Sequence, residues 1–245
     1  MRILAAARLR LGATEIDDNR SVSISITHAA HGRGALLLAD ISGYTGFLQG
    51  VADAHVGLIV EAPEPPPAYS LLSHLLDTIL ESLQPMFRLA KLEGDAVFAI
   101  EGATIEAGDA VLERVRGCYG AFSEQLASAG SLWTCTCDAC ARIDALDLKF
   151  VLHHGAYVIQ PVAGQAELLG TEVNIAHRLL KNHARELVGD VPYLLITDAA
   201  ADALAISTTE MAAGEETYEG MPPIPVHVLS LEGQGPGRGR PPEAS

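Results

Sequence analysis

The sequence predicts an α+β fold in which helices flank a mostly antiparallel sheet. Apolar runs of strand length alternate with segments whose apolar residues recur at helical spacing. Their order along the chain is strand, helix, strand, strand, helix, strand, which is the split β-α-β arrangement of ferredoxin-like domains. With 245 residues, of which 49% are apolar, the chain is long enough to bury one sizeable core.

The first half of this order begins with the buried strand ALLLAD, residues 35–40, and continues as a helical stretch to about residue 60. Four prolines within residues 61–70 cannot continue a helix, so we expect an extended insert there. A helix resumes over residues 70–83. Residues 86–102 predict a hairpin, because Gly94 supplies turn geometry between two apolar runs.

The second half begins with apolar residues at helical spacing over residues 105–130. Residues 146–162 have the β-branched and apolar character of one strand or of a strand pair. The remaining elements are expected in the order helix, strand, helix, strand, over residues 171–184, 193–197, from 198 onward, and 225–232.

The ends of the chain differ from this core. Residues 1–33 begin with a basic and apolar stretch, followed by a segment in which apolar and polar residues partly alternate, as in an exposed strand. We therefore expect an N-terminal appendage that could include a strand. The core domain then covers residues 34–232, with the Pro-rich insert at 61–70 and a Cys-rich insert at 129–145. Residues 233–245 are rich in Gly, Pro and Arg, and we expect a disordered tail.

Charge and composition exclude several classes of partner. The formal net charge of −15 argues against nucleic acid and anionic membrane surfaces as partners. No apolar stretch approaches membrane-spanning length, and Arg8 and Arg10 interrupt the start before a signal-like region develops, so we expect a cytoplasmic protein. Four cysteines in a chain of this length do not suggest a disulfide framework.

Two aspartates stand at the ends of strands that this topology makes neighbours. The first strand of a split β-α-β unit lies antiparallel to the third, so its end at Asp40 meets the start of the third at Asp95. Two carboxylates placed in this way suit Mg²⁺ or Mn²⁺, which would offset their repulsion. The alternative is that Asp40 caps the following helix and Asp95 is a turn residue.

Three separated segments resemble, in order, the motifs of the class III nucleotide cyclase domain, the adenylate and guanylate cyclase superfamily. They are ADISGYTGF, KLEGDAVFAI, and LKFVLHHGAY followed by LLGTEVNIAHRLLKN, and the match spans residues 36–182. The C-x-C-x-x-C insert and the phrases LDLKF and HRLLKN are similar to an uncharacterised bacterial branch of that superfamily. VNIAHR alone would fit an ordinary helix, so the resemblance depends on three motifs in the correct order.

The resemblance implies a role for individual residues. Asp40 and Asp95 match the two metal-binding aspartates. The backbone of Ile41, Gly43, Tyr44 and Thr45 matches the loop around the phosphates, and Ile41 is also assigned to the metal. Lys91 matches the lysine that reads adenine. Glu167 lies seven residues before Asn174, where adenylate cyclases usually have Asp, so the purine-reading pair would be Lys and Glu.

The same resemblance assigns Asn174 to the ribose and Arg178 to the phosphate in the transition state. The two residues are four apart and therefore on one helical face. The implied reaction is attack of the ribose 3′-hydroxyl of ATP on its α-phosphorus, which gives cyclic AMP and pyrophosphate with Mg²⁺ or Mn²⁺ as cofactor. Because superfamily sites lie between two subunits, a homodimer is implied.

One motif of the superfamily is missing. A lysine that grips the triphosphate usually precedes the last strand, and here that segment reads YEGMPPIPVHV. Lys181 follows Arg178 by three residues, and we hypothesise that it supplies the charge; the alternative is a solvated surface lysine. The missing lysine also leaves open a second function, a catalytically weak or inactive nucleotide-binding domain in signalling or interaction.

The sequence CTCDAC places Cys135, Cys137 and Cys140 within six residues. These thiolates would bind one Zn²⁺ if a fourth ligand arrived, for example Cys118 or a histidine such as His153, and an iron–sulfur cluster is the other metal interpretation. Three reduced thiols in a tight loop remain the alternative without metal. A metal there would offer a redox or metal-sensing input.

Overall fold

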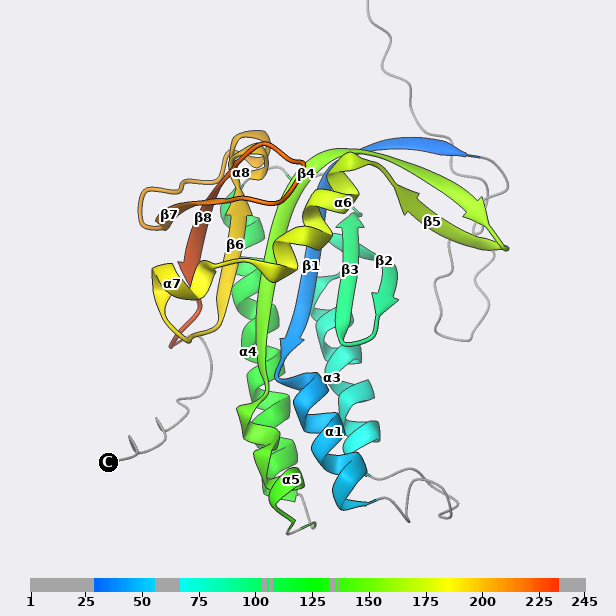
Figure 1. The fold of residues 1–245 in the computed structure, drawn as a ribbon, viewed down its shortest axis with the longest axis vertical. Coiled ribbons are helices and arrows are strands. Elements are labelled where there is room, and N and C mark those ends of the chain that lie inside the picture. Colours follow the sequence, from blue (N-terminus) through cyan, green and yellow to red (C-terminus); the bar gives the residue numbers. More distant parts are fainter. Residues whose placement is uncertain are drawn as a thin grey trace, which may run out of the picture.

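The computed structural model describes residues 29–55, 67–102, 105, 108–132, 135 and 137–233. An eight-stranded sheet forms its centre, in the order β2-β3-β1-β4-β6-β8-β7, with β5 paired to β4 (Figure 1). The strands are β1 (Ala30–Ser42), β2 (Phe87–Glu93), β3 (Ala96–Glu101), β4 (Asp147–Val162), β5 (Gln165–Leu169), β6 (Tyr193–Thr197), β7 (Ala212–Glu216) and β8 (Ile224–Ser230). The helices are α1 (Tyr44–Ala54), α3 (Pro67–Leu83), α4 (Gly108–Leu132), α5 (Asp138–Ala141), α6 (Thr171–Arg178), α7 (Ala184–Val188) and α8 (Asp198–Leu204).

Strand β1 lies between β3 and β4 and is antiparallel to both. Its last part pairs Asp40 with Ala96 of β3 and with Lys149 of β4. Among the described strands only β4 and β6 pair in parallel. The predicted α+β class with a mostly antiparallel sheet is therefore confirmed, and the first strand lies beside the third as the split β-α-β order requires.

Both faces of β1 are covered, which explains why its sequence is a nearly continuous apolar run. Side chains such as Leu37 and Ile41 pack with α1, α3 and α4 into the larger core. Leu36 and Leu38 point to the opposite face, into a second core with α6 and α7. Because side chains alternate along a strand, Asp40 lies on the α6 face of the sheet.

Several predicted elements occur with close to the expected bounds, including the helix α3, the hairpin β2–β3 and the helix α4. Residues 147–162 form the single long strand β4, so the predicted segment 146–162 is one strand rather than a strand pair. The expected helix over 171–184 is interrupted: α6 ends at Arg178, a 3₁₀ turn covers Leu179–Lys181, and α7 follows. The sequence reasoning missed β5 and β7.

The predicted appendage, Pro-rich insert and tail lie partly or wholly outside the residues that the structure describes. Residues 30–33, assigned to the appendage, form the start of β1, whereas residues 1–28 lie outside the described residues. Residues 61–66 of the Pro-rich insert and 234–245 of the tail also lie outside them. Among the residues that the structure describes, no helix combines the length and apolar character needed to cross a membrane.

Candidate functional site

The structure brings the two predicted metal carboxylates together at one end of the sheet. Asp40 lies near the end of β1, and Asp95 lies in the turn between β2 and β3, where its carbonyl accepts a hydrogen bond from the Ile41 amide at 3.3 Å. Burial and then the negative charge of Asp40 raise the pKa of Asp95. A divalent cation would relieve this repulsion, so the carboxylates and the nearby Ile41 backbone fit the expected ion.

A lysine that the sequence reasoning did not single out lies beside Asp40. Lys149 Nζ is 2.9 Å from Asp40 Oδ2, and it also donates to the carbonyl of Leu180 at 3.2 Å. Both side chains are mostly buried, with 20% and 17% of the side chain exposed for Lys149 and Asp40. The available signal was a single lysine inside the otherwise apolar strand sequence LDLKFVL.

The predicted phosphate loop leads from β1 directly into α1. Gly43 precedes the helix with φ of 85°, a left-handed conformation that favours glycine. The N-cap residue is Gly43, whereas Asp40 lies within β1 and pairs with Lys149, so the alternative in which Asp40 is the cap is wrong. Tyr44 and Thr45 begin the helix, and the backbone N–H groups of a first turn lack partners within the helix and attract anions.

The predicted purine-reading pair is formed within one chain. Lys91 of β2 donates to both carboxylate oxygens of Glu167 of β5, at 3.0 Å each. Of the two side chains, 47% and 30% are exposed, so a ligand can reach the pair. The pairing depends on β5, a strand that the sequence reasoning missed.

Helix α6 is held against the sheet by two histidine–carboxylate contacts. Glu172 in its first turn lies 2.7 Å from His153 Nε2 of β4, and His177 in its last turn lies 2.8 Å from the Glu93 carboxylate of β2. Val173 and Ala176 are buried on the inner face. His153 thus positions a helix instead of reacting or binding a metal.

The opposite side of α6 presents the two residues assigned to ribose and phosphate. Asn174 and Arg178 are both exposed there. Lys181 is also exposed, but it lies in the 3₁₀ turn after α6, and its carbonyl accepts a hydrogen bond from Tyr218 Oη at 3.4 Å. Lys181 is therefore next to the segment between β7 and β8 that lacks the superfamily lysine.

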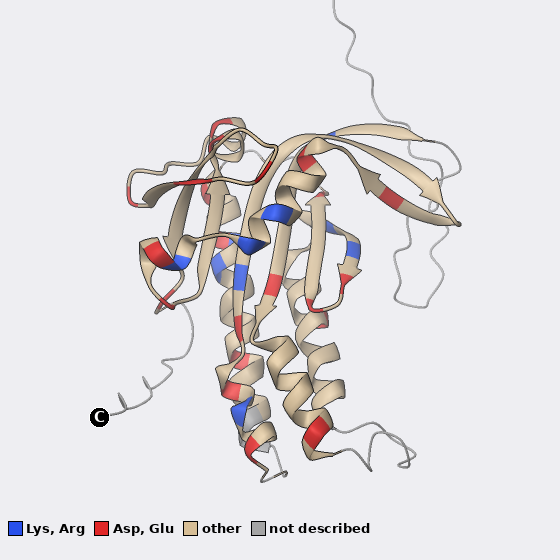
Figure 2. Cartoon of the chain, viewed as in Figure 1, with Lys and Arg blue, Asp and Glu red and all other residues tan. Residues whose placement is uncertain are grey.

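Basic residues gather on this part of the molecule despite the acidic composition of the chain. Figure 2 shows a basic residue near the end of α6, one in the turn that follows it, and one on the neighbouring part of β4. The contributing residues include Lys149, Arg178 and Lys181, and the Lys149 bond to Leu180 joins β4 to that turn. Arg178 and Lys181 are exposed and would meet a polyphosphate, whereas Lys149 is already paired with Asp40.

The cysteines form a second site, and the residue that joins them is a histidine, as the sequence allowed, although it is His55 and not His153. The sulfur atoms of Cys135, Cys137 and Cys140 surround His55 Nε2, at 3.6, 3.3 and 3.5 Å. The Cys140 amide donates to Cys137 Sγ and, as the largest cause, lowers the pKa of Cys137 to about 6. His55 follows α1, 80 residues before Cys135, and no spacing motif marks it.

The two residues named from the sequence as examples of a fourth ligand, Cys118 and His153, lie elsewhere. Cys118 is buried in the larger core, where burial raises the pKa of its thiol to about 12 and its sulfur contacts the Ile79 carbonyl. His153 Nδ1 lies 2.9 Å from Thr197 Oγ1 and its other nitrogen meets Glu172. Neither belongs to the cysteine cluster.

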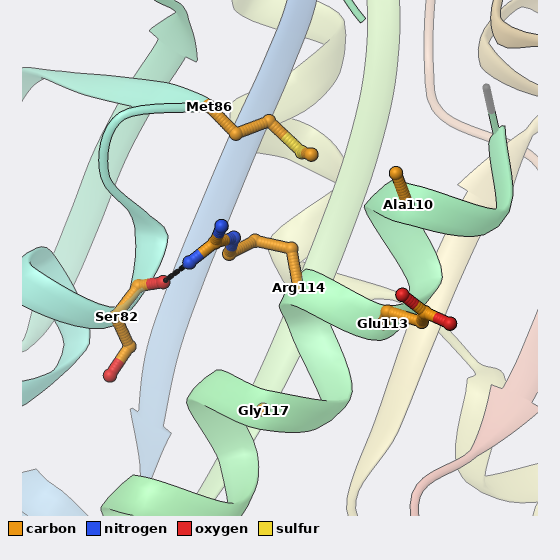
Figure 3. A pocket seen from close by; sticks show the side chains of 6 residues that line it. All are labelled: Ser82, Met86, Ala110, Glu113, Arg114 and Gly117. Carbon is orange, nitrogen blue, oxygen red and sulfur yellow. Dashed lines mark hydrogen bonds between the residues drawn. The ribbon is translucent and has the colours of Figure 1, made fainter. Parts of the chain in front are cut away.

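A cavity of about 430 Å³ lies between α3 and α4, on the helical side opposite Asp40. Its lining is formed by Ser82, Met86, Ala110, Glu113, Arg114 and Gly117 (Figure 3). Arg114 donates to the Ser82 carbonyl at 3.0 Å, so this guanidinium already satisfies the end of α3. None of the predicted nucleotide or metal ligands lines this cavity.

Comparisons with known proteins place these sites in a family context. A family model described as a protein of unknown function, DUF2652, matches residues 72–187. The uncharacterised protein Rv2561/Rv2562 of Mycobacterium tuberculosis is 32% identical over 166 residues, which cover 65% of this chain and 73% of that protein.

Solved structures with the same fold are nucleotide cyclases and a related protein. The guanylyl cyclase Cya2 matches with a TM-score of 0.54 and 14% identity, over 84% of this chain and all (100%) of that one. The adenylyl cyclase CyaB from P. aeruginosa matches with a TM-score of 0.56 and 15% identity, over 82% and 96%.

A third match is a class III adenylyl cyclase-like ATP-binding protein from Pseudomonas aeruginosa, with a TM-score of 0.52 and 14% identity, over 71% of this chain and 35% of that one. At identities this low, the structural likeness establishes the fold alone. The chemistry has to be argued from the residues of the site. The chain belongs to the same family as the uncharacterised mycobacterial protein, and its fold is that of the class III nucleotide cyclases.

Proposed function

We propose that this protein is a nucleotide cyclase-like enzyme that converts ATP to cyclic AMP and pyrophosphate, with a divalent metal, at the interface of a homodimer. The observation that carries the proposal is the Lys91–Glu167 pair, in which two strands far apart in sequence present a donor and an acceptor to solvent. Adenine offers a ring acceptor and an exocyclic amino donor, which this pair complements. Asp40 and Asp95, which lie close to each other at the end of β1, supply the metal ligands that a triphosphate requires.

The residues around the start of α1 and the residues of α6 have separate tasks. Asp40, Asp95 and the Ile41 carbonyl would hold Mg²⁺ or Mn²⁺, which when bound activates the 3′-hydroxyl and neutralises the triphosphate. The N–H groups that follow Gly43 bind phosphate oxygens at the start of α1. Asn174 orients the ribose, and Arg178 stabilises the charge that develops on the α-phosphate.

Glu167 in place of the usual aspartate keeps the acceptor charge and adds one methylene. The 3.0 Å contacts show that the longer side chain still reaches Lys91. A shift of this size in a binding pocket changes discrimination by about 1 kcal/mol or more. ATP remains the favoured substrate because Lys91 is retained.

Lys181 supplies the charge that the segment before the last strand lacks. Tyr218 lies in that segment and donates a hydrogen bond to the Lys181 carbonyl, so Lys181 is beside the segment. Arg178 is also near: burial chiefly raises the pKa of Tyr218, and the charge of Arg178 opposes the rise. Lys181→Ala should raise the Michaelis constant for Mg-ATP, whereas Arg178→Ala should mainly lower kcat. An unchanged Michaelis constant in an active Lys181→Ala preparation would remove Lys181 from the triphosphate site.

A second function follows from the same departure. Residues 212–230, all of which the structure describes, contain no lysine or arginine. One structural neighbour is described as a cyclase-like ATP-binding protein. The alternative is therefore a nucleotide-binding domain in signalling or interaction, which keeps the metal and purine contacts with little turnover.

A single assay distinguishes these functions. Purified protein is incubated with Mn²⁺ and either ATP or GTP, and cyclic product is measured by chromatography beside nucleotide binding by calorimetry. The enzyme proposal expects cyclic AMP from the wild-type protein and a loss of at least about 100-fold for Asp40→Ala. Binding of ATP without any cyclic product would support the second function and overturn the first.

A further inference from the structure

The side chains of His55, Cys135, Cys137 and Cys140 converge at the end of α1, away from the carboxylates at the start of that helix. Their ligand atoms all lie within 4.8 Å of one another. Cys140 is buried, and the other three are half-buried. We refer to these four residues as the Cys3His cluster.

Hydrogen bonding cannot account for the arrangement. The three sulfur atoms lie 3.3–3.6 Å from the same atom, His55 Nε2. A neutral imidazole nitrogen carries one hydrogen or one lone pair, so it can make a good hydrogen bond to one thiol and not to three. Three sulfurs around one nitrogen instead indicate a common centre between them.

The distances fit a tetrahedral ion. With Zn–S of about 2.3 Å and Zn–N of about 2.0–2.1 Å, tetrahedral angles place nitrogen and sulfur about 3.6 Å apart. The observed separations are 3.6, 3.3 and 3.5 Å, close to that edge length. Three thiolates and one imidazole are also the donor set of a structural zinc site.

We propose that the Cys3His cluster binds one Zn²⁺ as a closed structural site. All four positions are filled by protein, so no coordination position remains for a substrate. Binding exchanges thiol protons for the ion, and these protons are released to solvent. The proposal concerns the fold alone and does not depend on cyclase activity.

The ion would connect two parts of the chain that are distant in sequence. His55 ends α1, whereas Cys137 and Cys140 lie at the start of and within α5. The two helices already pack closely, because a Cβ on Gly50 would lie 3.4 Å from Ala139 Cβ. Zinc would therefore fix the end of the helix whose first residues form the phosphate loop.

The first test measures metal in the intact protein. The full chain is expressed with zinc present, purified under reducing conditions and analysed by inductively coupled plasma mass spectrometry. We expect about one equivalent of zinc per chain, and Co²⁺ in its place should give the intense visible bands of a tetrahedral site with thiolate charge transfer. Protein that contains iron and sulfide instead, or neither metal after reconstitution with zinc, would overturn the proposal.

Variants then locate the ion. His55→Ala and Cys137→Ser should each weaken zinc binding at least tenfold in a chelator competition, whereas two matched controls should retain it. The controls are His74→Ala, an exposed histidine of α3, and Cys118→Ala, the one cysteine outside the cluster. Loss of zinc in the controls, or retention in both cluster variants, would contradict the assignment.

A third measurement remains informative if a variant does not fold. Wild-type protein is compared before and after zinc removal by hydrogen exchange, and exchange within Tyr44–Ala54 should accelerate on removal, with β6 as the unaffected internal reference. Equal exchange rates in α1 would show that the ion does not fix this helix.

Discussion

The carboxylate of Asp40 takes part in two interactions that oppose each other in charge. Asp95 lies close enough for its pKa to be raised by Asp40, after the larger effect of burial, and Lys149 Nζ lies 2.9 Å from Asp40 Oδ2. The ammonium group is therefore a cation that already neutralises part of the site. A metal ion at the aspartates has to share Asp40 with this lysine or displace it.

This competition predicts an effect of Lys149→Met. The substitution keeps the length of the side chain and removes its charge, so repulsion between Asp40 and Asp95 is no longer offset by the protein. Mn²⁺ should then bind about tenfold more tightly, which corresponds to about 1.4 kcal/mol. Titration of the nucleotide-free protein with Mn²⁺, followed by electron paramagnetic resonance, measures the affinity.

The matched control is Lys91→Met, because this lysine pairs with Glu167 instead of with either aspartate. Its Mn²⁺ affinity should equal that of the wild-type protein. If Lys149→Met binds Mn²⁺ no better than Lys91→Met does, Lys149 does not compete with metal at Asp40.

At the scale of elements, the turn into α1 connects the metal ligands to the phosphate loop. Gly43 has φ of 85°, and a Cβ there would lie 3.4 Å from the Ala145 carbonyl oxygen. The left-handed conformation, more than the available space, is what favours glycine at this position. Gly46, by contrast, is exposed within α1, and a Cβ added to it would meet no atom within 4 Å beyond the backbone of its own helix.

Opposite effects are therefore expected from the same substitution three residues apart. Gly43→Ala should lower the free energy of unfolding by about 1–2 kcal/mol, because alanine resists the left-handed conformation. Gly46→Ala should raise it by about 1 kcal/mol, because alanine favours the helix. Urea denaturation followed by circular dichroism measures both, and effects of equal sign would contradict the role assigned to Gly43.

The elements that sequence could predict are those whose own residues specify them. The apolar run before Asp40, the Gly94 turn and the helical spacing of α4 are local signals, and the structure contains each of them. The strands β5 and β7 were missed because they are short and only partly buried, with sequences QAELL and AAGEE that carry little β propensity. Pairing with a neighbouring strand, rather than propensity, determines them.

The residues of the site could likewise be predicted only where local sequence or topology specifies them. Asp40 and Asp95 could be paired from topology, because adjacent antiparallel strands fix which ends meet. Lys149 and His55 could not, since each reaches its partner through tertiary packing and neither has a motif of its own. The interruption of α6 after Arg178 also has no proline or glycine to signal it.

At the scale of the whole molecule, the charge distribution is uneven. The chain carries a formal charge of −15, and yet basic residues gather around α6 and β4 (Figure 2). The exposed Arg178 and Lys181 would attract a polyphosphate toward the site although the protein as a whole repels anions. Raising the ionic strength should accordingly weaken nucleotide binding, since exposed charges are screened.

The proposed homodimer has a consequence that only mixed assemblies reveal. As the resemblance to the class III cyclases implies, each site of this homodimer would take Asp40 from one subunit and Arg178 from the other, so Asp40→Ala and Arg178→Ala chains should each have very little activity alone. A dimer of one Asp40→Ala chain and one Arg178→Ala chain has one site with both defects and one site with neither. Random exchange of equal amounts should therefore restore about one quarter of the wild-type rate of cyclic AMP formation, because half of the dimers are mixed and each has one intact site of two. A mixture as inactive as its components, with exchange of subunits verified by native mass spectrometry, would show that the site is not shared between chains.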